Sequence, residues 1–191
     1  MTYLLLGMLI FFAAHSVRIY ADGWRSARIA QWGEPAWKGM VALASLAGLA
    51  LMAWGYGETR VMPDLWSPPV WTRHLTSLLT LPAFVLLVAA YVPGTRIKAE
   101  VGHPMVIGVM LWAFAHLVAN GRAGDLVLFG GFLVWTWADY LSARSRDRVA
   151  GTRYAAGPWG RDVTAVAIGI VAWALFARWG HVLLIRVAPF A

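Results

Sequence analysis

The sequence predicts an all-α fold, a polytopic transmembrane bundle of about six helices. Of the 191 residues, 60% are hydrophobic and only 13% are charged, which is about half the charged fraction of a typical soluble domain. The apolar residues are also concentrated in six long stretches separated by polar breaks. A soluble globule of this length could not hide so much apolar surface, because a large part of its surface stays in contact with water. The lipid bilayer is therefore the expected environment and the first expected partner.

The six apolar stretches define the expected helices. They cover Thr2–Val17, Gly39–Gly57, His74–Val92, Pro104–Ala119, Leu126–Leu141 and Val163–Val187. Spanning a bilayer takes about 20 residues, so the first, fourth and fifth stretches need an extra turn from their flanks or a thinner bilayer. The apolar runs are continuous rather than alternating, which favours helices over a β-barrel. No repeat or second domain is visible, and residues 1–191 are expected to form a single transmembrane domain.

The basic residues predict an orientation in the membrane. Eleven of the 16 Lys and Arg residues fall in the first, third and fifth loops. The positive-inside rule places these loops in the cytoplasm and both termini outside, as in a bacterial inner-membrane protein. The net charge of +7 is thereby assigned to membrane loops and not to nucleic-acid binding. The N-terminus lacks a basic segment before its apolar run, so it is expected to be a retained helix rather than a signal peptide.

The absence of cysteine excludes several kinds of site. The chain can form no disulfide, no cysteine-bound iron–sulfur cluster and no thiolate zinc site. Covalent attachment of c-type haem is excluded for the same reason, because it requires a C-x-x-C-H motif.

Two of the five histidines are predicted to lie deep in the membrane. At a rise of about 1.5 Å per residue, His15 and His116 each lie about 20 Å along their helices. His74 and His103 lie at helix ends, and His181 is near the outer end of the last helix. An ionisable side chain inside a bilayer is costly and indicates a function. Two neutral imidazoles can hold a b-type haem between helices, although a hydrogen bond to a neighbouring helix would be a purely structural alternative.

The residues near the two deep histidines are compatible with a bound cofactor and also with ordinary helix packing. Along the fourth stretch, Trp112, His116 and Asn120 recur every four residues and therefore share one helix face. An aromatic ring can stack on a flat cofactor and an amide can bind its edge, but ordinary helix packing gives the same pattern. Asp139 is the one acid inside an apolar stretch. A structural ion pair with Arg144 or a histidine, or snorkelling to the membrane edge, is the expected role, and contact with a water-filled cavity is the alternative.

Three segments resemble the NnrU family. These are Ala13-Ala14-His15-Ser16, Arg73-His74-Leu75, and the long segment from Gly102-His103-Pro104-Met105 through Trp112-Ala113-Phe114-Ala115-His116 to Asn120-Gly121. The resemblance covers almost the whole chain. The family domain also occurs in the plant and algal carotenoid isomerase Z-ISO, an integral membrane haem b protein.

The resemblance implies haem b as cofactor, with His15 and His116 as the iron ligands. It also implies a hydrophobic substrate or nitric oxide as the small-molecule partner. Arg73, Arg122 and Arg96 are candidate partners for the haem propionates. His74 and His103 are candidate supporting residues or end caps of their helices. Two features depart from Z-ISO. Ala113 stands where Z-ISO has a cysteine, which excludes a thiolate ligand, and a further Z-ISO histidine has no counterpart in Gly55-Tyr56-Gly57-Glu58.

Several functions therefore remain open at this point. Bacterial NnrU proteins were named for genes that accompany denitrification, so a redox- or NO-linked accessory factor is one expectation and a Z-ISO-like cis-trans isomerase is another. A membrane methyltransferase is an alternative, because some carry a similar His-Pro stretch. Such enzymes pair this stretch with two glutamates, whereas the counterpart here, Arg144–Tyr154, is basic and has Asp147 as its one acid. A non-catalytic assembly factor is the third alternative.

Overall fold

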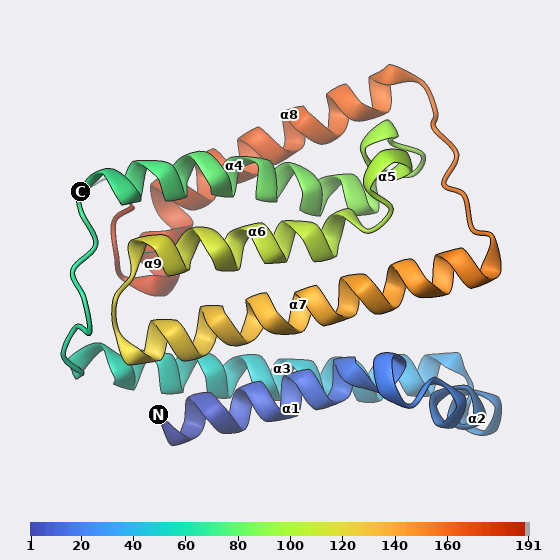
Figure 1. Cartoon of the computed structure of the whole chain (residues 1–191), viewed down its shortest axis with the longest axis horizontal. Helices are drawn as coiled ribbons and strands as arrows, with labels where there is room; N and C mark the ends of the chain where they lie inside the picture. Colours follow the sequence, from blue (N-terminus) through green and yellow to red (C-terminus); the bar gives the residue numbers. More distant parts are fainter. Residues whose placement is uncertain (190–191) are drawn as a thin grey trace. The chain divides into compact units, whose positions relative to one another are not determined.

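The all-α prediction is confirmed by the computed structural model, which describes residues 1–189. The α-helices are α1 (Thr2–Tyr20), α2 (Asp22–Trp32), α3 (Glu34–Glu58), α4 (Trp71–Tyr91), α5 (Arg96–Val101), α6 (Pro104–Ala119), α7 (Ala123–Ala150), α8 (Trp159–Leu175) and α9 (His181–Ile185). A 3₁₀ turn, η1 (Thr59–Val61), follows α3, and a π-helical turn, η2 (Phe176–Gly180), joins α8 to α9. Figure 1 shows this order along the chain.

Five helical segments within residues 1–189 are long and apolar enough to cross a membrane, and α6 is a shorter apolar helix. The spans are Thr2–Tyr20, Glu34–Val61, Trp71–Tyr91, Ala123–Ala150 and Trp159–Ile185. The flanks do lengthen the first and fifth predicted stretches, to 19 and 28 residues. The fourth stays at 16 residues, or about 24 Å.

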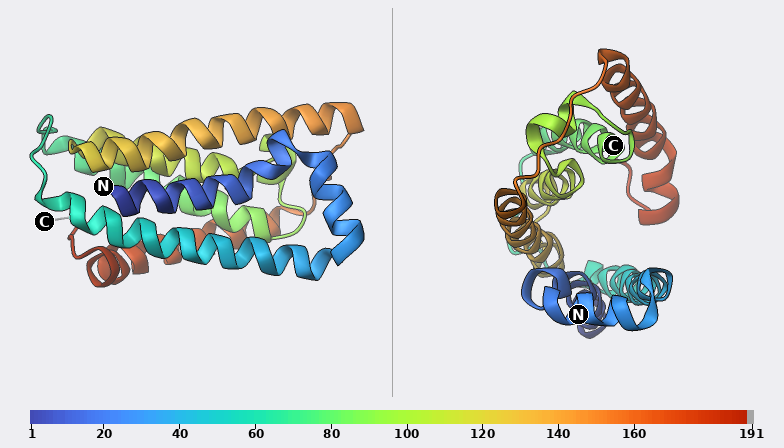
Figure 2. Two further views of the ribbon diagram at one scale, coloured as in Figure 1. Left: turned by 90° about the horizontal axis from the view of Figure 1, so that it is seen from below. Right: turned by 90° about the vertical axis from the view of Figure 1, so that its right-hand side faces the viewer.

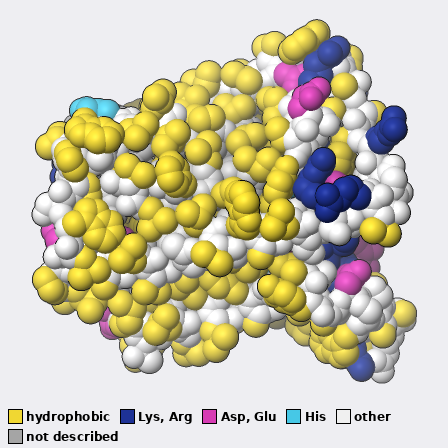
Figure 3. All heavy atoms as spheres, in the orientation of Figure 1, with side chains coloured by type: hydrophobic (Ala, Val, Ile, Leu, Met, Phe, Trp, Pro, Cys, Tyr) yellow, Lys and Arg dark blue, Asp and Glu magenta, His cyan; other side chains and the backbone are white. Residues whose placement is uncertain are grey.

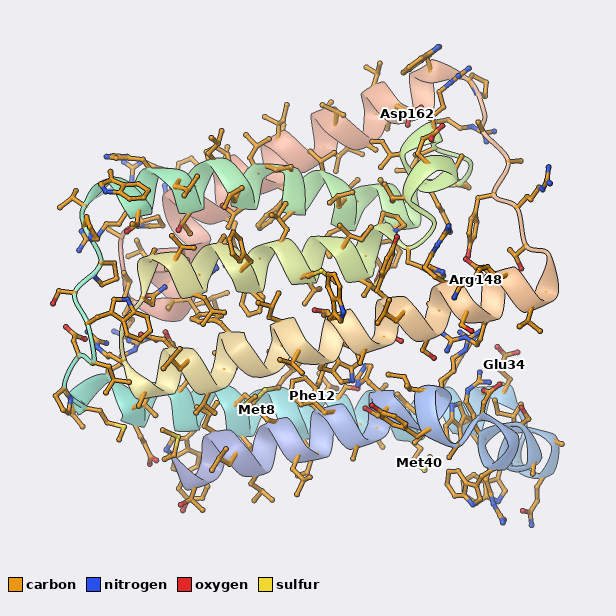
Figure 4. The ribbon with its side chains drawn as sticks, in the orientation of Figure 1. Met8, Phe12, Glu34, Met40, Arg148 and Asp162 are labelled. Atoms are coloured by element: carbon orange, nitrogen blue, oxygen red, sulfur yellow. The ribbon has the colours of Figure 1, made fainter. Side chains whose placement is uncertain are left out.

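Two short helices were not predicted. Helix α2 lies within the predicted first loop and has no buried residue. Its Arg28 guanidinium lies over Trp24 and Trp32, 5.6 and 5.7 Å from the ring centroids. The second, α5, begins with Thr95 as its N-cap, whose hydroxyl accepts from the Lys98 N–H at 3.1 Å. The Asp162 carboxylate accepts from the Ile97 N–H at 3.0 Å, and Figure 4 shows Asp162 beside α5.

The helices group into two compact units. Unit 1 contains residues 1–66 and 121–131, and unit 2 contains residues 67–120 and 132–191. The long helix α7 contributes its N-terminal part to unit 1 and the remainder to unit 2.

In unit 1, α1 lies along α3 (Figures 1 and 2). Glycines allow the close approach, since a side chain on Gly7 would meet the Gly48 carbonyl oxygen at 2.6 Å. A side chain on Gly55 would meet the backbone of Tyr3 and Leu4. Leu4 is fully buried. Small residues at the contact are typical of membrane helices, because association there depends on close packing rather than on the hydrophobic effect.

In unit 2, α4 contacts both α6 and α8, as Figure 2 also shows. The Thr76 hydroxyl donates to the Ala115 carbonyl at 2.8 Å, and further along α4 the Ala83 carbonyl lies against Gly108. These contacts make α4 and α6 antiparallel, so the start of α4 lies at the end of α6. The Trp173 indole donates to the Thr80 hydroxyl at 3.1 Å and joins α8 to α4.

Candidate functional site

His15 lies in unit 1, toward the C-terminal end of α1, and is half-buried. Its Nδ1 is 2.8 Å from the Phe11 carbonyl oxygen, and its ring stacks on Phe11 with centroids 4.1 Å apart. A carbonyl oxygen can only accept, so Nδ1 must carry the hydrogen of this bond. In the neutral imidazole the lone pair is then on Nε2, the form in which histidine binds a metal.

His116 repeats this arrangement in unit 2, in the last turn of α6. Its Nδ1 is 2.8 Å from the Trp112 carbonyl oxygen, which again places the neutral lone pair on Nε2. The Trp112 ring lies against the imidazole with centroids 5.2 Å apart, and its indole meets Phe132 edge to face at 5.6 Å. The Asn120 side-chain amide donates to the His116 carbonyl at 2.8 Å. The predicted face of Trp112, His116 and Asn120 is therefore one connected group.

Arg73 and His74 lie in the first turn of α4 and are exposed. Because α4 and α6 are antiparallel, this turn and Asn120 lie at the same end of unit 2. The Arg73 carbonyl accepts from the Ser77 hydroxyl at 3.1 Å. The structure thus brings Arg73 and His74 to the end of α6 that carries His116.

His103 lies at the opposite end of α6, about 20 Å along the helix from His116. Its Nε2 is 2.8 Å from Asp147 Oδ2. The Tyr154 hydroxyl donates to the same carboxylate at 3.1 and 3.2 Å, and Arg144 Nη1 is 3.9 Å from it. We refer to His103, Arg144, Asp147 and Tyr154 as the His103 cluster. The structure does not bring His103 together with the other predicted site residues of unit 2.

Local backbone geometry builds the His103 cluster. Gly102 ends α5 with φ of +75°, a conformation that L side chains rarely adopt. Arg144 also lies against it, with Nη1 2.8 Å from where a Cβ would be. His103 then becomes the N-cap of α6. At the end of α7, the Thr152 N–H donates to the Asp147 carbonyl at 2.9 Å, and the returning chain brings Tyr154 back to Asp147.

Sequence reasoning did not single out Asp147 and Tyr154 as site residues. The sequence does contain one indication, because Asp147 is the one acid in a basic segment. A carboxylate that is removed from water needs a specific partner. A buried acid was also overlooked in unit 1. Asp125 accepts from the Tyr56 hydroxyl at 2.7 Å and from the Arg122 N–H at 2.9 Å, so its carboxylate holds the start of α7 against the end of α3.

Among residues 1–189, no three His, Asp or Glu side chains gather as ligands of a metal ion. Haem iron needs only one or two protein ligands. His15 and His116 each have the tautomer that leaves Nε2 as the ligating nitrogen.

A family model described as NnrU protein matches residues 3–189. No curated protein and no solved structure matches the chain significantly.

Proposed function

Since the chain belongs to the NnrU family, we propose that it is an integral membrane protein that binds haem b, with His15 and His116 as iron ligands. Its membrane character follows from the five long apolar helices within residues 1–189. The haem assignment rests on one shared feature of the two imidazoles, the hydrogen bond from Nδ1 to the carbonyl four residues earlier. Metal-binding histidines nearly always donate their other ring N–H in this way, which fixes the ring and raises the basicity of the ligating nitrogen.

The surroundings of each imidazole support the same role. Phe11 and Trp112 each present an aromatic ring to the neighbouring histidine, and aromatic surfaces suit a flat macrocycle. Asn120 fixes the last turn of α6 through its bond to the His116 carbonyl. Arg73 is the proposed partner for a propionate, because guanidinium–carboxylate pairs are strong, and His74 beside it is a candidate supporting residue.

The proposed activity depends on the chemistry that a haem iron would supply. Haem supplies one-electron chemistry and, if an imidazole dissociates, an open coordination position for nitric oxide or a double bond. We favour a redox- or NO-linked accessory role in denitrification over a Z-ISO-like isomerisation. Ala113 and the segment Gly55-Tyr56-Gly57-Glu58 lack two Z-ISO features, and these departures bear on isomerisation more than on haem binding. The proposed location is the bacterial inner membrane with both termini outside.

An optical spectrum of the detergent-purified protein tests haem binding directly. The expected result is a low-spin b-type spectrum in oxidised and dithionite-reduced samples, confirmed by a pyridine haemochrome assay. His15→Ala and His116→Ala should each lose haem or become high-spin. His181→Ala is the matched control, because His181 lies in α9, outside the two helices that carry the proposed ligands, and its Nδ1 is 2.7 Å from the Val187 carbonyl oxygen. A wild-type protein that stays colourless after haem is supplied would refute the proposal.

One observation supports methyltransferase activity as a second candidate. The structure brings Gly102-His103-Pro104 against Arg144–Tyr154, the two stretches that pair in the membrane methyltransferases considered above. Asp147 is, however, already bound by His103 and Tyr154, and it stands alone where those enzymes use two glutamates. Saturable binding of S-adenosylmethionine that is lost in Asp147→Asn would favour this reading. A protein that binds neither haem nor S-adenosylmethionine would leave the non-catalytic assembly factor.

A further inference from the structure

An apolar groove runs between α6 and the middle of α7, within unit 2. It has a volume of about 590 Å³ and is lined by Ile107, Met110, Leu111, Phe114, Leu133, Val134 and Trp137. Its lining side chains are all apolar, and Phe114, Val134 and Trp137 are among the exposed large hydrophobic residues. In a membrane helix bundle, such a groove suits a hydrocarbon chain.

One end of the groove leads to the His103 cluster. His103 precedes Ile107 by one helical turn, and Tyr140 follows Trp137 by about one turn. The rings of His103 and Tyr140 meet edge to face with centroids 6.4 Å apart. One turn beyond Tyr140, on the same face of α7, lies Arg144. The distance along α7 from Trp137 to Arg144 is therefore about 10.5 Å.

Positive charge exceeds negative charge at that end. Lys98 Nζ lies 5.8 Å from the centroid of the Tyr154 ring, and Arg144 lies 3.9 Å from Asp147. The carboxylate of Asp147 also accepts hydrogen bonds from His103 and Tyr154. It is therefore shared among several donors and does not pair with Arg144 alone. Figure 4 shows Arg148 at the same end of α7. Dark blue side chains gather at this end of unit 2, whereas yellow ones cover the length of the helices (Figure 3).

We propose that this groove and the basic residues at its end form a binding site for one anionic phospholipid. An acyl chain lies in the groove, and Lys98 and Arg144 bind the phosphate of the headgroup. The orientation proposed above places this end in the cytoplasmic leaflet, where basic pockets between helices bind anionic headgroups. A zwitterionic lipid carries the same phosphate, but its quaternary ammonium offsets that charge beside the two cations. The net charge of the headgroup is therefore what selects the occupant.

Native mass spectrometry of the full chain in detergent tests the proposal. Phosphatidylglycerol and phosphatidylcholine with identical acyl chains are compared, and phosphatidylglycerol is expected to bind about 30-fold more tightly. This estimate follows from about fivefold for each basic side chain near the headgroup. Glycerol 3-phosphate, which lacks acyl chains, is expected not to bind measurably. Equal binding of the two lipids, or binding of glycerol 3-phosphate as tight as that of phosphatidylglycerol, would overturn the proposal.

Variants separate the headgroup from the acyl chain. Lys98→Gln with Arg144→Gln should abolish the preference for phosphatidylglycerol, and Arg144→Lys should retain most of it. Arg178→Gln is the matched control, since its side chain lies over Trp179 in η2, far along the chain from the groove. Persistence of the full preference in the double variant would overturn the headgroup assignment.

A bulkier residue in the groove tests the acyl chain. Leu133→Trp should weaken both lipids, whereas Leu78→Trp, at an exposed position of α4 outside the groove, should weaken neither. Unchanged binding in Leu133→Trp would overturn the groove assignment. Haem spectra play no part in these measurements, so the lipid and haem proposals succeed or fail separately.

Discussion

The contact between α1 and α3 predicts a large difference between two nearly adjacent glycines. A Cβ at Gly55 would lie 2.7 Å from Leu4 Cα and from the Tyr3 carbonyl carbon. The backbone nitrogen of Leu4 would lie closer still. Optimal carbon–carbon separation begins near 3.5 Å, so α1 would have to retreat by at least about 0.8 Å. The obstructing atoms are backbone, and no rotamer change can relieve the overlap. At Gly57, two residues later on α3, an added Cβ would meet nothing within 4 Å.

Both Gly→Ala changes gain the same helix propensity, about 0.8–1 kcal/mol, and their difference therefore isolates the packing cost. A retreat of this size forfeits a quarter to a half of the dispersion energy of affected contacts, and overpacking typically costs about 1–3 kcal/mol. We expect Gly55→Ala to be less stable than Gly57→Ala by about 2 kcal/mol, or roughly 30-fold in the unfolding equilibrium. Unfolding by SDS in mixed micelles, followed by near-UV circular dichroism, measures this difference. Equal midpoints for the two variants would refute the packing argument.

Two further predictions concern the His103 cluster. Gly102→Ala should destabilise the protein by more than Gly151→Ala, because both glycines have positive φ but only Gly102 lies against Arg144. SDS titrations of the two variants measure the difference in stability. Equal midpoints would show that backbone strain alone, and not the contact with Arg144, sets the loss of stability. Asp147→Asn should cost about 2 kcal/mol in the same titration, since it replaces a charged acceptor of hydrogen bonds from two side chains, and a stability equal to wild type would contradict the partners assigned to Asp147.

The hydrophobic pattern was sufficient to predict the fold class and the helices that carry it. The fourth stretch, Pro104–Ala119, coincides with α6, because Pro104 opens the helix and the apolar run ends at Asn120. The hydrophobic pattern did not predict the two shorter helices α2 and α5. Helix α2 contains five polar or charged residues among its eleven, so its apolar signal is too weak to separate it from a loop. Helix α5 depends on Thr95 and Asp162, and the latter is 65 residues away from its partner Ile97.

The candidate site was predictable only in part for a similar reason. His15 and His116 were identified by their depth in apolar stretches, and the bonds to Phe11 and Trp112 follow from the helix period, since residue i−4 lies on the same face. Contacts between distant segments carry no local signal. The bond from His103 to Asp147 joins residues 44 positions apart, and it depends on how α6 and α7 pack in unit 2.

Helix α6 raises the question of whether it crosses the bilayer at all. At about 24 Å it is shorter than a hydrocarbon core of about 30 Å, so its ends can lie within the apolar region only if their polar groups have partners or the bilayer thins. Each end has a polar group with a partner. His103 is bonded to Asp147 at one end, and Asn120 is bonded to the His116 carbonyl at the other. We therefore expect α6 to cross.

Because the chain contains no cysteine, single cysteines can test this crossing without background. Val61 and Val149 are 91% and 89% exposed. Val61 ends η1, which follows α3, and Val149 lies at the end of α7. Along the chain, the apolar helices α4, α6 and α7 lie between them. Three crossings place these residues on opposite sides of the membrane, whereas two would place them on the same side. A membrane-impermeant maleimide added to intact cells should label Val61→Cys, and Val149→Cys should react only in inverted vesicles. Labelling of both from one side would show that α6 does not cross, and the reverse labelling pattern would contradict the orientation that the basic loops predict.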